Sequence, residues 1–229
     1  MSLENIPDKD QNKKEIVSDL IGFDIGKLIR TCKDLTHVPG PTIDAYVRGE
    51  RSRHLSPINY YVLIFGASFL IESLLGIGEY AVSRIMVAPG PDQDLTRLNS
   101  ILEAFFQRKE IQLLFILPGT ILFQWLLFRK FRPSFIQNVF FALFAGAQYL
   151  LLTLPLVLLF LVSKEVHYQV TLVSSFILPV LFNTYAAIGF YGVGWKGLLW
   201  RSALVYLLNM PLVTIITALM VATANWLYG

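Results

Sequence analysis

Residues 135–162 read FIQNVFFALFAGAQYLLLTLPLVLLFLV, a run without a single Asp, Glu, Lys or Arg. As a helix this run would be about 42 Å long, at about 1.5 Å per residue, whereas the hydrocarbon core of a bilayer is only about 30 Å thick. It is therefore predicted to form one membrane-spanning helix that tilts, begins along the interface or kinks at Pro155. Splitting the run at Pro155 would leave two pieces too short to cross.

Four further apolar runs come close to the roughly 20 residues that a spanning helix needs. The composition points the same way, because 55% of the 229 residues are apolar and only 15% are charged, against about 25% charged in soluble domains. We therefore expect an all-α integral membrane helical bundle rather than a soluble enzyme or a disordered chain. The five predicted transmembrane helices cover residues 57–77, 111–128, 135–162, 169–193 and 199–226. Tyr60 and Tyr61, near the start of the first, are expected to lie at the membrane interface.

The basic residues near the span ends predict the orientation, because Lys and Arg collect in cytoplasmic loops. The loops expected outside are balanced or nearly uncharged, with four basic and five acidic residues over 79–110. The alternation holds through all five spans and predicts a cytoplasmic N-terminus and an extracytoplasmic C-terminus. The eight residues assigned to the cytoplasmic side are Arg48, Arg51, Arg53, Arg129, Lys130, Arg132, Lys196 and Arg201.

The chain divides into three parts by composition. Residues 1–14 are polar and are predicted to be disordered. Residues 15–56 form a cytoplasmic segment in which apolar residues recur at helical spacing from Ile16 to Leu35 among basic ones, so we expect an amphipathic helix on the inner leaflet. Residues 57–229 form the membrane domain, whose long outer loop carries an apolar stripe over 95–106 that predicts another surface helix.

Polar residues within the spans are expected to meet in layers. Glu72 is the only acidic residue inside a predicted span, and a charge in the membrane usually has a partner or a function. The layers either bond helices to one another or line a wet path. Counting residues from the span ends places Glu72, Gln148, Ser174 and Ser175 in an outer layer, and Gln124, Asn183 and Asn209 in an inner one.

Arg48, Arg51 and Arg53 stand within ten residues of the first span. One interpretation is that these charges only hold the loop on the cytoplasmic side. The other is that the arginines bind anionic lipid headgroups, because a guanidinium group can donate two parallel hydrogen bonds to a phosphate. Both alternatives stay open at this stage.

Known catalytic motifs are missing from the sequence. It holds no phosphate-binding loop, no helix with paired His residues and no Gly-x-Ser-x-Gly turn. Three scattered His residues and one cysteine, Cys32, predict neither a metal site nor a disulfide. We therefore expect no catalytic residues, no cofactor and no nucleic-acid partner.

The stretch Thr31–Pro57, TCKDLTHVPGPTIDAYVRGERSRHLSP, resembles the signature of a bacterial multi-pass membrane family of unknown function. A second stretch, Tyr185–Leu199, resembles an aromatic-Gly-x-x-Trp-x-Lys pattern of that family. The resemblance implies a membrane fold and a location in the cytoplasmic (inner) membrane of a bacterium, but no activity. Typical members carry an N-terminal zinc ribbon, which a chain with one cysteine cannot form, and a Glu-His pair that is Gln137-Asn138 here. The matching residues are Pro39, Gly40, Tyr46, Gly49, Arg51, Arg53, Pro57, Tyr191, Gly192, Trp195 and Lys196.

Two functional hypotheses follow from these features. The first is a non-enzymatic membrane component that binds lipids, including anionic ones, or another membrane protein. The second is a small transporter or channel that uses the polar layer around Glu72. The two differ in whether the replacement of Glu72 by Gln should be tolerated or should abolish a flux.

Overall fold

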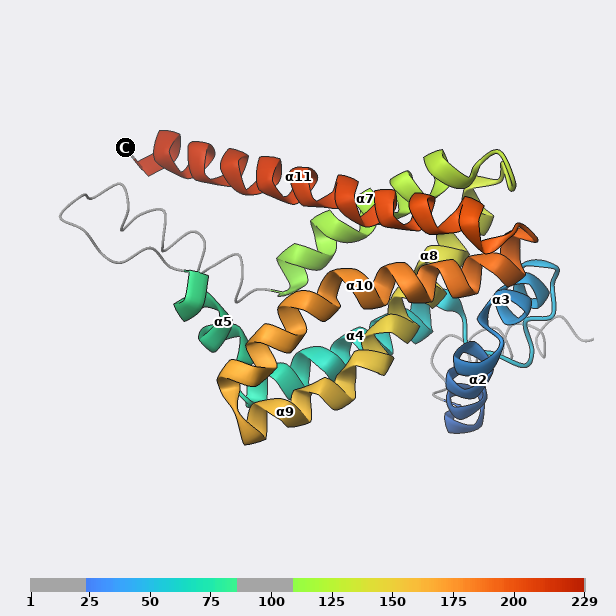
Figure 1. The fold of residues 1–229 in the computed structure, drawn as a ribbon, viewed down its shortest axis with the longest axis horizontal. Helices are drawn as coiled ribbons and strands as arrows, with labels where there is room; N and C mark the ends of the chain where they lie inside the picture. The colour runs from blue at the N-terminus through green and yellow to red at the C-terminus, as the bar shows by residue number, and fades with distance from the viewer. Residues whose placement is uncertain (1–23, 86–108, 229) are drawn as a thin grey trace, which may run out of the picture.

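A computed structural model describes residues 24–85 and 109–228 of the chain. Within these residues the fold is all-helical and has no strand. Five long helices form the bundle, and two short helices lie across one of its ends (Figure 1). The long helices are α4 (Pro57–Leu74), α7 (Lys109–Phe128), α8 (Phe135–Thr153), α10 (Lys164–Tyr191) and α11 (Trp195–Tyr228).

Three of the described segments are long and apolar enough to cross a membrane, namely Pro57–Leu74, Phe135–Val162 and Lys164–Tyr191. Large apolar side chains on their outer faces are exposed, as at Leu158 and Leu172. An apolar surface of this kind is costly in water and is typical of lipid-facing helices. The chain therefore has the character of a membrane protein.

The long third run continues through Pro155 without a chain reversal. α8 ends at Thr153, one 3₁₀ turn covers Leu154–Leu156, and α9 follows as Val157–Val162. Proline has no backbone N–H to donate to an α-helical hydrogen bond, which explains the tighter turn at this point. The irregularity predicted at Pro155 is present, and the run remains a single candidate span.

Two short helices, α2 (Ile25–His37) and α3 (Pro39–Val47), lie across the end of the bundle that we call the inner end (Figure 1). The side chain of Asp24 caps α2 by accepting a hydrogen bond from the N–H of Lys27 at 3.0 Å. The chain breaks between these helices at Val38, and α3 starts directly at Pro39, whose fixed φ suits the first turn of a helix.

α3 packs against α10 with backbone in contact with backbone. A Cβ atom added to Gly40 would lie 2.5 Å from the carbonyl oxygen of Ala186 and 2.5 Å from the Cα of Gly189. Only glycine therefore fits at this crossing. The contact fixes α3 against the bundle and buries the side chains of Ile43 and Tyr46.

The first span differs from the prediction in two respects. α4 ends at Leu74 rather than at residue 77, because Gly76 adopts a left-handed conformation with a φ of 67° and starts the separate helix α5 (Ile77–Ile85). Tyr60, predicted to lie at the membrane interface, is instead fully buried, because its hydroxyl finds a partner inside the bundle. The other end of the molecule, which carries α5 and α9, is called the outer end below.

Some predictions fall outside the described residues. These are the polar stretch 1–14, the beginning of the amphipathic segment before residue 24, and the surface helix over 95–106. Of the amphipathic segment, the part within Ile25–His37 is helical.

Candidate functional site

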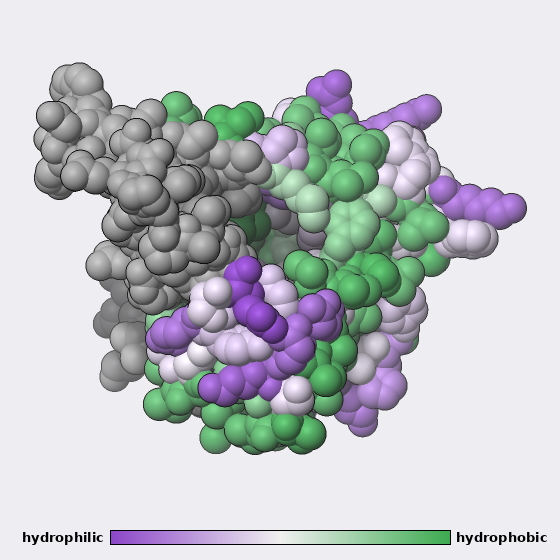
Figure 2. Space-filling view, turned by 60° about the vertical axis from the view of Figure 1, so that its left-hand side comes forward, coloured by the Kyte–Doolittle hydropathy of each residue, from purple (hydrophilic) through white to green (hydrophobic). Residues whose placement is uncertain are grey.

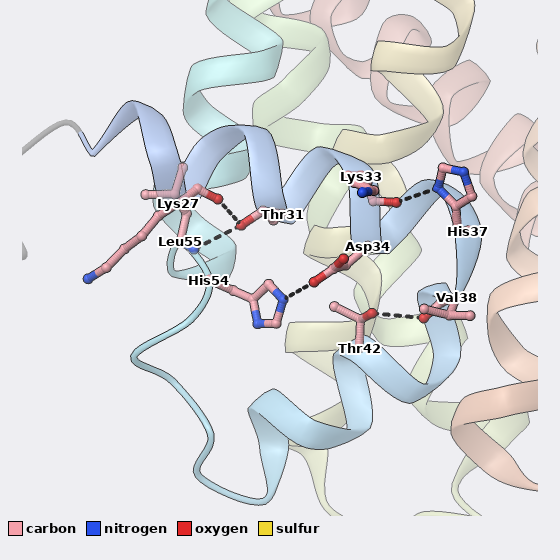
Figure 3. Close-up of polar contacts among 9 residues, drawn as sticks. All are labelled: Lys27, Thr31, Lys33, Asp34, His37, Val38, Thr42, His54 and Leu55. Carbon is pink, nitrogen blue, oxygen red and sulfur yellow. Dashed lines mark hydrogen bonds and ion pairs between the residues drawn. The ribbon is translucent and has the colours of Figure 1, made fainter.

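The inner end is held together by side chains of α2 and of the loop that leads into α4 (Figure 3). The hydroxyl of Thr31 donates to the carbonyl oxygen of Lys27 and accepts the N–H of Leu55 at 3.0 Å. Nε2 of the buried His54 lies 2.9 Å from Oδ2 of Asp34. These two links fix the loop over residues 48–56 against α2.

The three arginines of the predicted headgroup site lie on or beside this loop, and their side chains are exposed. Arg48 forms an ion pair with Asp44 at 3.2 Å. The guanidinium carbon of Arg51 lies 5.7 Å from the centre of the Tyr46 ring. No contact between the guanidinium groups of Arg48, Arg51 and Arg53 is recorded among the described residues.

Two other arginines at the inner end are integrated into the bundle. Arg132 forms an ion pair with Asp44, and its guanidinium carbon lies 4.2 Å from the centre of the Phe190 ring. The guanidinium carbon of Arg201 likewise lies 4.9 Å from the centre of the Phe131 ring. These contacts tie the loop after α7 to α3, α10 and α11, and the sequence alone did not reveal them.

A buried hydrogen-bond network, which we call the inner network, lies between α7, α8, α10 and α11. The side-chain amide of Gln124 donates to the Tyr191 hydroxyl at 3.1 Å, and that hydroxyl donates to Oδ1 of Asn138 at 2.7 Å. Nδ2 of Asn183 donates to Oε1 of Gln124 at 3.3 Å and to the hydroxyl of Ser202 at 3.0 Å. All five side chains are buried, so the network cross-links four helices inside the bundle.

Gln148 belongs to a different polar contact. Its Oε1 accepts a hydrogen bond from the Tyr60 hydroxyl, and its Nε2 donates to the hydroxyl of Thr36 at 2.7 Å. The Tyr60 hydroxyl also lies 3.5 Å from Sγ of Cys32. Gln148 thus joins α8 to α4 and to α2.

A cavity of about 510 Å³ occupies the outer half of the bundle, between α4, α7, α8, α10 and α11. Its lining on α10 extends from His167 to Asn183, a distance of about 24 Å along a helix at about 1.5 Å per residue. The cavity is therefore elongated along the bundle. Its walls are mainly apolar and include Phe65, Ile116, Leu117, Ala145, Leu150 and Val157.

Polar side chains line the cavity at both ends, in addition to Thr120, Thr153 and three tyrosines. Towards the inner end, Gln124 and Asn183 belong both to the lining and to the inner network. Towards the outer end, α4 contributes Glu72, and α10 contributes a row of polar residues. The lining residues of that row are His167, Thr171, Ser174 and Ser175.

The outer end of the cavity is bordered by α5, which follows the turn at Gly76. Ile77 lines the cavity and packs with Val157 and Phe160. One turn further, the Tyr80 hydroxyl donates to Glu165 at 3.0 Å, and Glu165 also pairs with Arg84. Figure 2, which brings this end of the molecule forward, shows hydrophilic residues gathered here beside a recess in the surface.

The structure thus brings together some predicted residues and separates others. Glu72, Ser174 and Ser175 line the same cavity, whereas Gln148 is not among the lining residues and bonds to Tyr60 and Thr36. In the predicted inner layer, Gln124 and Asn183 are hydrogen-bonded, while Nδ2 of Asn209 donates to the hydroxyl of Thr120 at 3.2 Å. Among residues 24–85 and 109–228, no group of three or more His, Cys, Asp or Glu side chains could hold a metal ion.

Residues 26–69 match a family described as a protein of unknown function (DUF3667). The matched segment begins in α2, contains α3 and the Asp34–His54 contact, and ends in α4. It includes the stretch 31–57, and the match fits the resemblance to an uncharacterised family. No curated protein and no solved structure matches the chain.

Proposed function

We propose that this chain is a non-enzymatic, multi-pass membrane protein that binds an amphipathic molecule in the cavity of its outer half. The observation that carries the proposal is the combination of an elongated apolar chamber with a row of polar groups near one end. A volume of about 510 Å³ lies within the roughly 300–1,000 Å³ of known small-molecule sites.

The surroundings of the cavity support a ligand that comes from the bilayer. The outer faces of α4 and α10 expose large apolar side chains such as Val62, Leu70 and Leu172, as expected for helices in contact with lipid. A molecule already dissolved in the bilayer would reach the cavity without crossing water, and its apolar tail would contact the apolar walls.

Five spans, with the N-terminus inside and the C-terminus outside, are part of the proposal. The helical segments support it, because α7 and α11 fall where the second and fifth spans are predicted. The connection from α7 to α8, which carries Arg129, and the connection from α10 to α11, which Lys196 follows, lie at the same end of the bundle as α2 and α3 (Figure 1). Basic turns at one end fit the rule that Lys and Arg remain in the cytoplasm, and a bacterial inner membrane remains the expected location.

Ligand binding is tested with a variant whose larger side chain fills the cavity. Ser174→Phe places a ring in the chamber, whereas Val173→Phe adds the same ring to a neighbouring side chain that is 60% exposed and is not part of the lining. The purified chain is released from nonionic micelles and weighed by native mass spectrometry after incubation with single-chain C12 amphiphiles. We expect Ser174→Phe to lose the bound amphiphile and Val173→Phe to keep it. Equal binding by both variants would overturn the proposal.

A second candidate function is transport, and the inner network supports it. Gln124 and Asn183 separate the cavity from the inner end through hydrogen bonds that reach Asn138 and, through its Nδ2, the carbonyl oxygen of Arg132 at 3.0 Å. A carrier would open this barrier and close the outer end in turn. Glu72→Gln should then abolish flux into proteoliposomes, while the binding protein would tolerate the change.

The inner end is proposed to contact anionic lipid. Arg51 and Arg53 are exposed on a loop that two hydrogen bonds hold against α2. Basic residues at an anionic surface contribute about 1 kcal/mol each. Two acidic residues of this end have basic partners, because Asp44 pairs with Arg48 and Arg132 and Asp34 contacts His54, so their carboxylates repel an anionic headgroup less.

A further inference from the structure

We infer that the cavity binds a quinone with an apolar tail, whose carbonyl oxygens accept hydrogen bonds from the hydroxyl groups of Tyr61, Tyr149 and Tyr206. The inference rests on the proposed function, because it names the ligand class of the same cavity. Three properties of the described lining lead to it: the hydrogen-bond donors that are open to a ligand, the lack of an available cation, and the aromatic walls.

The three tyrosines come from three helices and gather on the cavity wall. Tyr61 belongs to α4, Tyr149 to α8 and Tyr206 to α11, and all three line the cavity. The Tyr61 ring lies against α8, because a Cβ atom added to Gly146 would lie 3.1 Å from Cε2 of that ring. Tyr149 follows Gly146 by nearly one helical turn. Tyr206 interacts electrostatically with both other tyrosines, so the three phenol groups lie in one region of the wall.

The hydroxyl groups of these tyrosines are open to a ligand. Within residues 24–85 and 109–228, no hydrogen bond is recorded for any of them, and each side chain is only partly buried. A hydroxyl group that loses water without gaining another partner costs free energy. Each phenol can donate one hydrogen bond, so a ligand that carries acceptors would satisfy donors from several helices at once.

Four other hydroxyl groups of the lining have no hydrogen left for a ligand, because each donates to a backbone carbonyl oxygen of its own helix. The bond from Ser175 to the carbonyl oxygen of Leu172, at 2.8 Å, is one of them. Such a hydroxyl group can only accept a further hydrogen bond. The four residues are Thr120, Thr153, Ser174 and Ser175.

The remaining polar groups of the described lining are mostly paired. Asn183 donates both amide hydrogens within the inner network, and Gln124 donates one of its two there. Oγ1 of Thr171 lies 3.3 Å from Nε2 of His167, and the two bond to each other. Glu72 has an interaction partner of its own and is not counted among the groups available to a ligand. The tyrosines therefore supply most of the available donors.

The described part of the lining offers no free cation to a negatively charged head. It contains no Lys or Arg, and its one histidine, His167, is bonded to Thr171. An anion in a medium of low dielectric constant is costly without a paired cation. The acceptor that fits the tyrosine donors is therefore an uncharged carbonyl oxygen rather than a carboxylate or a phosphate.

Aromatic side chains form much of the wall. The rings of Tyr61 and Phe65 are stacked, with centres 6.2 Å apart and planes at 8° to each other, and Tyr149 and Tyr206 add two further rings. Aromatic rings pack favourably against other flat rings in offset or edge contacts. A quinone combines a flat, uncharged ring with carbonyl oxygens at its edge. Its tail would lie along apolar lining residues such as Leu117, Leu150 and Leu156.

The test compares four probes with apolar tails of similar length. The quinone is 2-decyl-3-methyl-1,4-naphthoquinone, whose quinone carbons are fully substituted so that it does not add to the thiol of Cys32. The analogue 2-decyl-3-methylnaphthalene lacks the carbonyl oxygens, 6-decyl-2-naphthoate replaces them with a negative charge, and methyl dodecanoate keeps a neutral carbonyl group but has no ring. The full chain is bound to a resin in nonionic detergent near neutral pH, and retained probe is extracted and weighed against a blank resin.

We expect the naphthoquinone to bind about tenfold or more tightly than the naphthalene, since two neutral hydrogen bonds each contribute a factor of about five. Methyl dodecanoate should fall between them, and the naphthoate should bind least. The carbonyl stretching band of the bound naphthoquinone, measured by infrared spectroscopy, should lie at a lower frequency than in empty micelles, because a hydrogen bond weakens the C=O bond.

Variants locate the donors. The combined change Tyr61→Phe, Tyr149→Phe and Tyr206→Phe keeps the rings and removes the hydroxyl groups. The preference for the naphthoquinone over the naphthalene should then fall to near one, and the carbonyl band should return to its frequency in micelles. Each single change should lower the preference in part. Persistent naphthalene binding shows that the variants are folded. Tyr168→Phe removes the same group from α10 outside the lining and should keep the preference.

The outcomes separate this inference from the proposed function. If the naphthalene or the naphthoate binds the natural chain as tightly as the naphthoquinone, or if the triple variant keeps the preference, the quinone class is wrong while the cavity still binds apolar molecules. If none of the four probes binds, or if Ser174→Phe binds them as the natural chain does, the proposed function is wrong as well.

Discussion

The inner end and the outer half of this molecule use similar polar residues in opposite ways. In the inner network, Gln124, Asn183 and Tyr191 bond to side chains of other helices. In the outer half, Ser174 and Ser175 bond to the backbone of their own helix. Bonds between helices fix their separation, whereas bonds within one helix leave neighbouring helices free to enclose a space. Gln124 and Asn183 thus bound the cavity on its inner side, and its space lies along the outer part of α10, beside Ser174 and Ser175.

The largest loss of stability is expected from a change at the inner end, where α3 crosses α10. Gly40→Val would place its Cβ 2.5 Å from backbone atoms of α10, which cannot rotate away as a side chain could. We expect a loss of at least about 3 kcal/mol of stability, at the upper end of overpacking costs. Thermal unfolding in nonionic detergent measures the loss.

The matched control for this change is Gly66→Ala on α4, because a Cβ at Gly66 meets no atom within 4 Å. Alanine also favours a helix over glycine by about 1 kcal/mol, so this variant should unfold at the same or a slightly higher temperature. Equal melting of Gly40→Val and the natural chain would show that α3 does not depend on this contact.

The next largest effect on stability is expected when a polar side chain of the inner network is replaced by an apolar one, compared with the same kind of change in the outer half. Asn183→Leu removes the donor that serves Gln124 and Ser202 and should destabilise the chain by about 1–2 kcal/mol, because buried partners remain unpaired. Ser175→Ala removes a hydroxyl that bonds only within α10 and should change the melting temperature very little. If both variants lost the same stability, hydrogen bonds between helices would contribute no more to stability than hydrogen bonds within one helix.

Hydropathy alone predicts the helices of the bundle well. Residues 135–162 form one candidate span with an irregularity at Pro155, and α7 and α10 cover the predicted runs around them. The success has a simple cause, because a long apolar run without charges has few alternatives to a helix. Gly76, by contrast, ends the first helix early through a local backbone conformation that hydropathy does not register.

Side-chain partners are less predictable. Counting residues from the end of a span gives the depth of a side chain in the membrane, but not the direction in which it points around the helix axis. Gln148 was placed at the level of Glu72 by counting residues, yet it bonds to Tyr60 and Thr36. Rotation of α8 about its axis decides which side Gln148 faces, and this rotation depends on packing with α4 and α2. The burial of Tyr60 was missed for the same reason, since a Tyr near a span end is also typical of the interface.

A smaller effect concerns the loop that carries the exposed arginines. Asp34→Ala removes the partner of His54, and the loop should then open more often from α2. Since Arg51 and Arg53 are exposed on this loop, limited trypsin digestion should cut it severalfold faster. Glu50→Ala, a change at an exposed position of the same loop, serves as the control and should leave the cleavage rate unchanged. Unchanged cleavage of Asp34→Ala would mean that the Thr31–Leu55 bond alone holds the loop.

The smallest effect is expected from changes that keep the charge of the inner end. Arg51→Lys combined with Arg53→Lys preserves the topology signal but removes the paired donors of two guanidinium groups. If these arginines bind lipid headgroups, the double variant should retain about half as much anionic lipid or less, since the charge itself still contributes about 1 kcal/mol per residue. Native mass spectrometry of the chain released from mixed anionic and zwitterionic nanodiscs measures retention. Arg129→Lys changes a basic residue of the turn after α7, outside the matched segment, and should keep the full complement of lipid. Unchanged retention in the double variant would leave these arginines as a sorting signal alone, and the only ligand site proposed for this chain would be the cavity in its outer half.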